Sequence, residues 1–186
     1  WSSDVCSSDL YAVFNGLKRV IDFIEHFGFS ESDLEYLKSI GYKDDFLSYL
    51  KDLKFTGSIR SMQEGELCFG NEPLLRVEAP LIQAQLIETI LLNIVNFHTL
   101  ITTKASIIRQ IASNDKLMEF GTRRAQEIDA ALWGARAAYI GGFDSTSNVR
   151  AGKLFGIPVS GTHAHAFVQT YGDEYVAFKK YAERHK

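Results

Sequence analysis

The sequence predicts a mixed α/β fold, in which a helical and antiparallel-strand part at residues 11–115 precedes the first part of an irregular, incomplete (β/α) barrel at residues 116–186. Two patterns predict this fold class. In the first part, apolar residues alternate with charged ones before Pro80, which is typical of antiparallel strands. After Lys116, short apolar runs are separated by helix-length segments, which is the βαβ pattern.

The composition excludes several function classes. The chain has 186 residues, of which 46% are hydrophobic, and a net charge of −3, the balance of an ordinary soluble globular protein. A slightly acidic chain without basic runs argues against a nucleic-acid partner. The most apolar stretch, Leu81–Ile101, contains glutamine, glutamate, asparagine and histidine, so we predict a buried helix and no membrane span. Two cysteines form no disulfide framework and fit a reducing, cytoplasmic compartment.

The first ten residues, WSSDVCSSDL, differ from the rest of the chain. They repeat SSD, follow neither a helical nor a strand period, and resemble translated sequencing-adapter sequence. We therefore expect residues 1–10 to be a non-native leader and exclude them from the fold prediction. Because the visible start is then no natural terminus, the absence of a secretion signal is uninformative.

Three helices are expected next. Apolar residues recur at helical spacing over residues 16–27, and Gly28 closes the pattern. Ser30 followed by Asp33 can form a capping box at the start of a second helix. A short third helix is expected over residues 44–53. This part of the chain is interpreted as scaffold.

Residues 55–80 change period, and the segments MQEGE and NEP are typical of turns, so we expect two or three antiparallel strands. A long helix follows from Leu81 and continues, with or without a break, towards Ala112. It is apolar on nearly every side, so we expect it to be buried between layers.

The last part contains three apolar runs, LMEFG, AYIGGFD and IPVSG, each predicted to be a strand, and stops after a charged helix at Asp173–His185. A closed (β/α) barrel needs about eight strands and about 250 residues. We therefore expect a fragment that ends within a barrel domain.

Two turns rich in small residues, GGFDSTSN and SGTHAH, flank a helix-like segment, Val149–Phe155. Glycine, serine and threonine let the backbone approach a ligand closely and expose N–H groups to anions. In parallel α/β folds, sites are built at the carboxyl ends of strands. The ligand site is therefore expected at these turns.

The second turn carries three residues suited to chemistry. The His165 imidazole is largely unprotonated near neutral pH and can act as a nucleophile, although a histidine there can also simply cap or pack a helix. His163 and His165 together could instead hold a metal ion, but no cluster elsewhere completes the ligand set. The Thr162 hydroxyl could hold a carboxylate or phosphate oxygen, or form an ordinary turn.

Arg123 and Arg124 follow the predicted strand Leu117–Phe120. Side chains alternate along an extended segment, so one arginine is expected to face the site and the other to face solvent. A guanidinium can stack on an aromatic ring and pair with carboxylate or phosphate oxygens. The alternative is an exposed arginine pair without a ligand.

Three segments in order, NEPLLRVEAPLIQAQLIETILLN, EFGTRRAQ and RAAYIGGFDSTSNVRAGKLFGIPVSGTHAHAF, resemble the nicotinate phosphoribosyltransferase family. The resemblance covers most of Tyr11–Lys186. It implies transfer of nicotinate to phosphoribosyl pyrophosphate, forming nicotinate mononucleotide and pyrophosphate in NAD salvage. It further implies coupled ATP hydrolysis, magnesium ligands beyond Lys186, and a homodimeric full-length protein, so this chain alone is expected to be inactive.

The resemblance also implies residue roles. His165 matches the histidine that ATP phosphorylates, and Thr162 matches a nicotinate-binding threonine. Phe120 and Arg123 match a pair that sandwiches the pyridine ring in amide-using relatives, with Arg124 as a possible phosphate ligand. Ser147 stands where nicotinamide-using relatives carry an aspartate, which would repel a carboxylate, so serine favours the acid.

Departures and alternatives remain. Glu127 and Trp133 stand where the family usually has glycine and a small residue. The alternative functions are a metal-dependent hydrolase barrel that uses His163 and His165, a nicotinamide-using phosphoribosyltransferase, and a domain that only binds a partner subunit.

Overall fold

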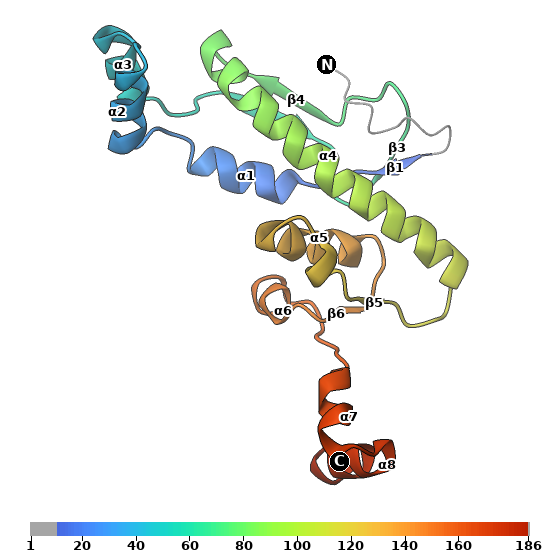
Figure 1. The fold of residues 1–186 in the computed structure, drawn as a ribbon. Coiled ribbons are helices and arrows are strands. Elements are labelled where there is room, and N and C mark those ends of the chain that lie inside the picture. Colours follow the sequence, from blue (N-terminus) through green and yellow to red (C-terminus); the bar gives the residue numbers. More distant parts are fainter. Residues whose placement is uncertain (1–10, 186) are drawn as a thin grey trace.

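The computed structural model describes residues 11–185, so the predicted leader at residues 1–10 lies outside the described residues. The helices are α1 Leu17–Glu25, α2 Glu31–Ser39, α3 Asp44–Lys51, α4 Leu81–Ala112, α5 Ile128–Ile140, α6 Val149–Phe155, α7 His165–Tyr171 and α8 Glu174–Arg184. The strands are β1 Ala12–Val13, β2 Ser58–Ser61, β3 Leu67–Cys68, β4 Leu75–Glu78, β5 Met118–Glu119 and β6 Ser145–Thr146. Figure 1 shows the long helix α4 with α1 and α5 below it, the strands β1, β3 and β4 above or behind it, and α6 beyond α5.

The expected helices and antiparallel strands of the N-terminal part are present. At the start of α2, the Ser30 hydroxyl accepts the N–H of Asp33, and the Asp33 carboxylate accepts the N–H of Ser30, which completes the capping box. β2 pairs antiparallel with β4, with Ile59 opposite Val77. β3 pairs instead with β1, a strand that the sequence did not indicate, so two separate two-stranded sheets form.

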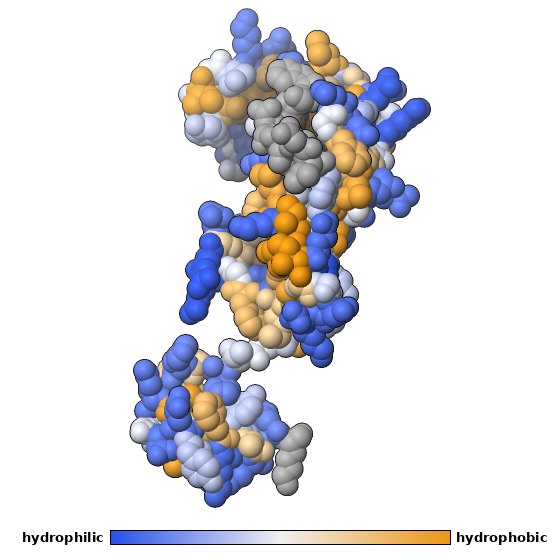
Figure 2. All heavy atoms as spheres, turned by 90° about the vertical axis from the view of Figure 1, so that its right-hand side faces the viewer, coloured by the Kyte–Doolittle hydropathy of each residue, from blue (hydrophilic) through white to orange (hydrophobic). Residues whose placement is uncertain are grey.

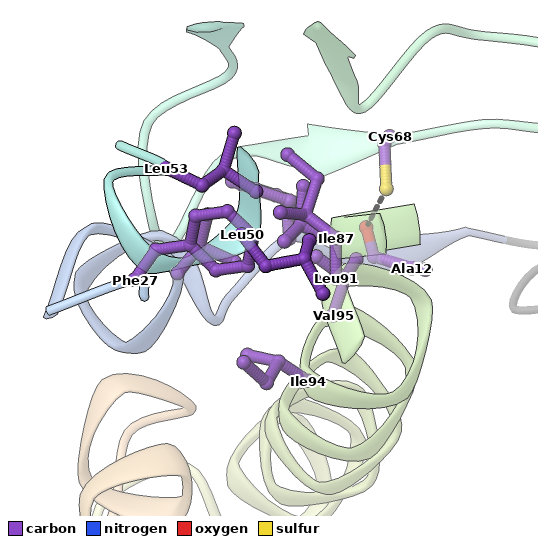
Figure 3. Close-up of a cluster of buried hydrophobic side chains, with 11 residues drawn as sticks. Ala12, Phe27, Leu50, Leu53, Cys68, Ile87, Leu91, Ile94 and Val95 are labelled. Carbon is purple, nitrogen blue, oxygen red and sulfur yellow. Dashed lines mark hydrogen bonds between the residues drawn. The ribbon is translucent and has the colours of Figure 1, made fainter. Parts of the chain in front are cut away.

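The N-terminal core lies between α4 and the elements that cover it (Figure 3). Ile87 and Leu91 of α4 pack with Val20 of α1 and Leu50 of α3, all of them buried. Fully burying such a side chain contributes about 1.5–3 kcal/mol. Apolar residues at helical spacing in α1, α2 and α3 therefore pack on one shared core.

Helix α4 is continuous from Leu81 to Ala112, which settles whether it is broken, but the prediction that it is buried between layers is wrong for part of its surface. Leu81, Leu100 and Ile111 are 77%, 48% and 82% exposed. The elements of residues 11–185 cover one stripe of the helix, and its other apolar residues face outwards. By length and composition alone α4 could cross a membrane, as many core helices could. Its buried stripe, however, includes polar residues such as His98 and Thr99, which a core helix can satisfy with protein partners.

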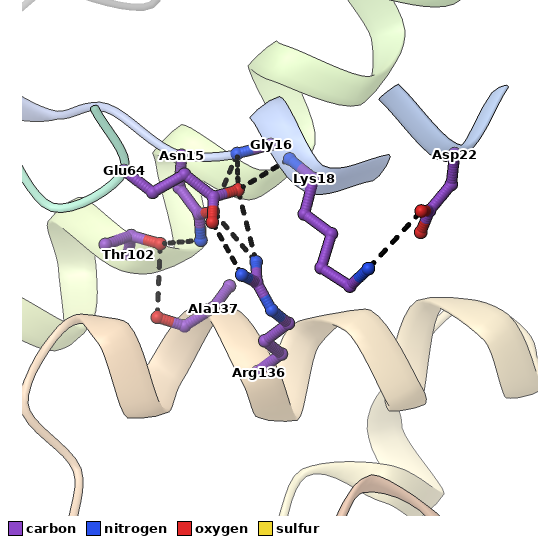
Figure 4. A network of polar contacts seen from close by, with 8 residues as sticks. All are labelled: Asn15, Gly16, Lys18, Asp22, Glu64, Thr102, Arg136 and Ala137. Carbon is purple, nitrogen blue, oxygen red and sulfur yellow. Dashed lines mark hydrogen bonds and ion pairs between the residues drawn. The ribbon is translucent and has the colours of Figure 1, made fainter. Parts of the chain in front are cut away.

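A polar network joins the N-terminal part to α5 (Figure 4). Arg136 of α5 pairs with Glu64, Nη2 to Oε2 at 2.5 Å, and both side chains are about 15% exposed (15% and 16%). Glu64 also accepts the backbone N–H groups of Gly16 and Lys18, each at 3.1 Å. Burial alone would raise the pKa of Glu64, but hydrogen bonds from Arg136 and from the Lys18 N–H outweigh it and hold the pKa below its usual value.

A second line of this network passes through α4. The side-chain amide of Asn15 donates to Thr102 Oγ1 at 2.7 Å, and Thr102 donates in turn to the carbonyl of Ala137 at 3.1 Å. Asn15 and Thr102 are fully buried, so these hydrogen bonds satisfy polar groups that would otherwise be costly inside the protein. The segment before α1, the middle of α4 and α5 are thereby held in one arrangement.

Parallel strands follow in the second part. β5 pairs parallel with β6, Met118 opposite Ser145, and Thr146 bridges in parallel to Val159. The mixed α/β fold class is confirmed. The prediction of a strand at AYIGGFD is wrong, because Tyr139 and Ile140 are the last residues of α5 and the strand begins only after the glycine turn.

The C-terminal helices α7 and α8 pack on each other and project from the rest of the described chain (Figures 1 and 2). The packing is aromatic: the ring centroid of His163 lies 4.7 Å from Tyr181 and 5.7 Å from Phe167. The predicted charged helix at Asp173–His185 is confirmed as α8.

Candidate active site at the ends of the parallel strands

The parallel register brings the segments that follow β5, β6 and the bridge at Val159 to one edge of the small sheet, whereas His165 lies on the projecting pair of α7 and α8. Backbone hydrogen bonds run from the N–H of Ser147 to the carbonyl of Glu119 at 2.9 Å and from the N–H of Ser160 to the carbonyl of Thr146 at 3.0 Å. Phe120 and Ser147 are therefore the first residues beyond β5 and β6, and Thr162 lies three residues beyond the bridge at Val159. Carboxyl ends of adjacent parallel strands are where α/β proteins build ligand sites.

The backbone at Arg123 and Arg124 differs from the expectation. These residues form a 3-10 helix, Thr122–Arg124, so the alternation expected for an extended segment does not apply and the prediction that one arginine faces the site while the other faces solvent has no basis. Both arginines are exposed, and Phe120 is 40% exposed. In sequence, both arginines lie within a few residues of the end of β5.

The sequence interpretation missed Glu119 as a single residue, although it lies in the EFGTRRAQ motif. One carboxylate oxygen accepts the backbone N–H of Gly121, and the other accepts the hydroxyl of Thr146 at 2.6 Å. The Thr146 oxygen also accepts the N–H of Asn148 at 3.0 Å. Thr146 is fully buried. Because Thr146 is 27 residues further along the chain, no local pattern could reveal this contact.

The opposite, amino-terminal ends of the strands are held by Arg109, near the end of α4. Its Nη2 pairs with Asp144 Oδ2 at 2.5 Å, and its Nε donates to the carbonyl of Gly142 at 2.6 Å. Asp144 also accepts the N–H of Leu117 at 2.7 Å; this bond and the one from Arg109 lower the Asp144 pKa. Gly141 lies so close to α4 that an added Cβ would be 2.5 Å from the Cβ of Ala105, so only glycine fits there.

The two histidines of the second turn have different surroundings. His165 is the first residue of α7 and is exposed. It lines a hollow of about 610 Å³ between α7 and α8, together with Gln169 and Glu174. His163 packs on the aromatic rings of this helix pair. Within residues 11–185, no three metal-ligating side chains come together, so the metal-dependent hydrolase has no geometry in its favour here.

Another hollow, of about 730 Å³, lies elsewhere, between α1, α4 and α5. It contains none of the predicted site residues. His98, in its wall, donates from Nδ1 to the carbonyl of Ile94 at 2.7 Å, and burial lowers its pKa. Among the described residues, the Nε2 of His98 is the one buried side-chain nitrogen or oxygen that has no hydrogen-bond partner.

Comparison with known proteins decides between the alternatives. Residues 5–96 match the nicotinate phosphoribosyltransferase (NAPRTase) N-terminal domain, and residues 116–183 match the nicotinate phosphoribosyltransferase (NAPRTase) family. The chain belongs to the nicotinate phosphoribosyltransferase family. The boundary between residues 115 and 116 remains a prediction.

Individual members of the nicotinate phosphoribosyltransferase family resemble the chain over most of its length. It is 66% identical over 177 residues to the Bacillus subtilis nicotinate phosphoribosyltransferase, covering 95% of this chain and 36% of the relative. The Caenorhabditis elegans nicotinate phosphoribosyltransferase is 44% identical, over 87% of this chain and 30% of the relative. The crystal structure of human nicotinic acid phosphoribosyltransferase superimposes with a TM-score of 0.80 at 39% identity, covering 86% of this chain and 33% of that one. The chain therefore spans about a third of the length of these relatives.

Glu127, where the sequence resemblance implies a glycine, has a backbone conformation that suits glycine. Its φ of 83° and ψ of 165° lie in a region that glycine adopts readily and other residues rarely do. The Glu127 carboxylate accepts the N–H of Asp129 at 2.9 Å and so caps α5, and this hydrogen bond lowers its pKa. The glutamate adds a cap at the cost of backbone strain.

Trp133, the second departure from the nicotinate phosphoribosyltransferase pattern, does not interrupt α5, which is continuous through this residue. Its ring is 8% exposed and lies 5.6 Å from the His98 ring and 5.1 Å from the Phe155 ring, measured between centroids. The guanidinium of Arg19 lies 4.9 Å from its centroid, within the range of a cation–π contact. The tryptophan is thus a packing residue between α1, α4 and α6.

Proposed function

We propose that a full-length protein containing this sequence, meaning one of the relatives' length, is a nicotinate phosphoribosyltransferase of NAD salvage. It forms nicotinate mononucleotide and pyrophosphate from nicotinate and phosphoribosyl pyrophosphate, with ATP hydrolysis coupled through phosphorylated His165. The observation that carries this proposal is the arrangement of Phe120, Ser147 and Thr162 just beyond the two parallel strands β5 and β6 and the parallel bridge at Val159. The chain alone, with a third of the relatives' length, is inactive in this proposal.

In this mechanism, the protein positions the substrates while the pyridine nitrogen attacks the anomeric carbon and pyrophosphate leaves. Phe120 and Arg123 enclose the pyridine ring, and the Thr162 hydroxyl donates to the nicotinate carboxylate. Arg124 pairs with phosphate oxygens. Orientation and charge stabilisation provide most of the rate, because the transition state has oxocarbenium character.

Phosphorylation of His165 fits the exposed imidazole at the start of α7. The unprotonated ring attacks the γ-phosphorus of ATP, ADP leaves, and the phosphoramidate is hydrolysed later in the cycle. Magnesium is implied by the family. Residues 11–185 bring no suitable set of carboxylates together, so we assign it no ligand in this chain and derive no step through it.

Ser147 provides the test of substrate class. It is half-buried directly after β6, where an aspartate would place a negative charge near the substituent of the pyridine. The full-length protein is expected to prefer nicotinate, and Ser147→Asp to move the preference towards nicotinamide by about ten- to a hundredfold, equivalent to about 1–3 kcal/mol.

The measurement is the ratio of kcat/KM for nicotinate and nicotinamide. Ser147→Asn is the matched control, because it has the size of aspartate without the charge and should change the ratio far less. An unchanged ratio in Ser147→Asp would place this residue away from the pyridine substituent. A wild-type preference for nicotinamide would contradict the proposed substrate.

The full-length protein is further proposed to be a cytoplasmic homodimer, as the family resemblance implies. The exposed apolar residues Leu100 and Ile111 of α4 need a covering surface that residues 11–185 do not supply. Light scattering of the full-length protein measures its mass, and a monomer at working concentrations would contradict the dimer.

A further inference from the structure

The Glu119 carboxylate connects two turns that carry predicted substrate contacts. One oxygen bonds the N–H of Gly121, in the turn that follows Phe120 and precedes Arg123. The other bonds the hydroxyl of Thr146, directly before Ser147. The Glu119 backbone carbonyl also accepts the N–H of Ser147 at 2.9 Å. A single residue therefore contacts both sides of the candidate pyridine site.

Gly121 gives a second, independent observation. Its φ is −80°, which any residue can adopt, so backbone conformation does not require glycine there. A Cβ added at Gly121 would lie 2.7 Å from the nearer oxygen of Glu119. The absence of a side chain at position 121 is thus what lets the carboxylate occupy its place against the turn.

Thr146 gives a third observation. It is fully buried, and its hydroxyl oxygen accepts the N–H of Asn148 at 3.0 Å while donating to Glu119. Since that hydroxyl proton is committed to the carboxylate, the conformation of the turn after β6 depends on Glu119. Hydrogen bonds to an ionised acceptor are about twice as strong as neutral ones.

We infer that Glu119 is a positioning residue for the pyridine substrate, holding the turn of Phe120 and Arg123 in register with the turn of Ser147. This inference rests on the proposed function. Glu119 acts through the two turns and does not itself touch the substrate. Losing it displaces groups that must enclose the ring, and a misplacement of about 1 Å can cost about a hundredfold in rate.

The test uses the full-length protein, three variants that disturb the Glu119 contacts and two control variants. Glu119→Gln has the same shape but cannot accept from both donors as the carboxylate does, and Gly121→Ala pushes the carboxylate away. Thr146→Val removes the hydroxyl, whereas Thr146→Ser keeps it and serves as the matched control. Glu35→Gln, an exposed carboxylate on α2, controls for loss of charge.

We expect Glu119→Gln, Gly121→Ala and Thr146→Val each to lower kcat/KM for nicotinate about ten- to a hundredfold, with a raised KM and an altered nicotinate-to-nicotinamide ratio. Thr146→Ser and Glu35→Gln should stay within about threefold of wild type. The double variant of Glu119→Gln with Thr146→Val should lose little more than either single variant, because both break the same contact.

Amide hydrogen exchange at Gly121 and Asn148 is read in parallel, and it should accelerate in Glu119→Gln whether or not substrate is turned over. A merely structural role would lower the fraction of folded protein but leave KM and the substrate ratio of that fraction unchanged, and this result would overturn the inference. Additive losses in the double variant would also overturn it. If wild type forms no nicotinate mononucleotide, the proposed function fails instead. Should Glu119→Gln not fold, the Thr146→Val and Thr146→Ser pair decides.

Discussion

The ion pair between Glu64 and Arg136 is expected to fix the N-terminal part onto α5, and Arg136→Met tests this directly. Methionine keeps most of the side-chain length while removing the guanidinium. Breaking a buried pair from one side costs about 3–5 kcal/mol. Here both side chains keep about 15% exposure (15% and 16%), and Glu64 retains two backbone donors. We therefore expect Arg136→Met to lower the free energy of unfolding by about 1–3 kcal/mol.

Replacing the glutamate of this pair should lower the free energy of unfolding more than replacing the arginine. Glu64→Leu removes the acceptor of Arg136 and also that of the N–H groups of Gly16 and Lys18. Urea unfolding of the full-length protein, followed by circular dichroism, gives both values, and the double variant gives the coupling between them. A loss below about 0.5 kcal/mol for Arg136→Met, the size of an ordinary surface substitution, would refute the argument.

The same pair predicts a pH dependence. Because the pKa of Glu64 is lower in the folded protein than its ordinary value, its contribution to stability is present above about pH 4.3, the ordinary pKa of a glutamate. It is lost as the pH falls from there through the folded pKa. Arg136→Met should reduce this part of the acid destabilisation, and identical acid unfolding curves for wild type and variant would contradict it.

Three further predictions follow from the site and its surroundings. His165→Ala in the full-length protein should lose ATP stimulation while keeping slow ATP-independent transfer, and unchanged ATP hydrolysis would exclude His165 as the phosphate acceptor. Glu127→Gly should leave the free energy of unfolding unchanged or raise it by up to about 2 kcal/mol, because it relieves about 1–3 kcal/mol of backbone strain while losing a helix cap. Urea unfolding measures this change, and a clear loss of stability would mean that the cap outweighs the strain. The 186-residue chain alone should aggregate, because the apolar side chains of Leu81 and Ile111 are exposed, and a reversible monomeric melt would contradict this.

Features encoded within a few residues could be predicted from the sequence. The capping box of Ser30 and Asp33 and the helix Val149–Phe155 are local, and the structure has both as predicted. AYIGGFD was assigned wrongly, because a short apolar run fits a buried strand and the end of a buried helix equally well. The preceding helical period, continued to Ile140, would have favoured the helix.

Contacts between distant residues could not be predicted. Glu119 meets a threonine 27 residues away, and Arg136 meets a glutamate 72 residues away. Neither pair has a sequence spacing that marks it. The position of Phe120, Ser147 and Thr162 at one edge was predictable, because βαβ connectivity places the carboxyl ends of parallel strands together. The 3-10 turn at Arg123 was not predicted, since the sequence analysis placed Arg123 and Arg124 on an extended segment.

Arg109 anchors one end of the small sheet to helix α4, and among residues 11–185 the other end has no such anchor to α4. Helix α4 has 32 residues, a stiff rod of about 48 Å at about 1.5 Å per residue, and its Arg109 holds the start of both β5 and β6 through Asp144 and Gly142. The other ends of the strands lead into exposed turns, including those of Phe120 and Thr162. The starts of β5 and β6 are therefore fixed to the helix, so a substrate that binds at the opposite ends of the strands meets turns built on an anchored frame.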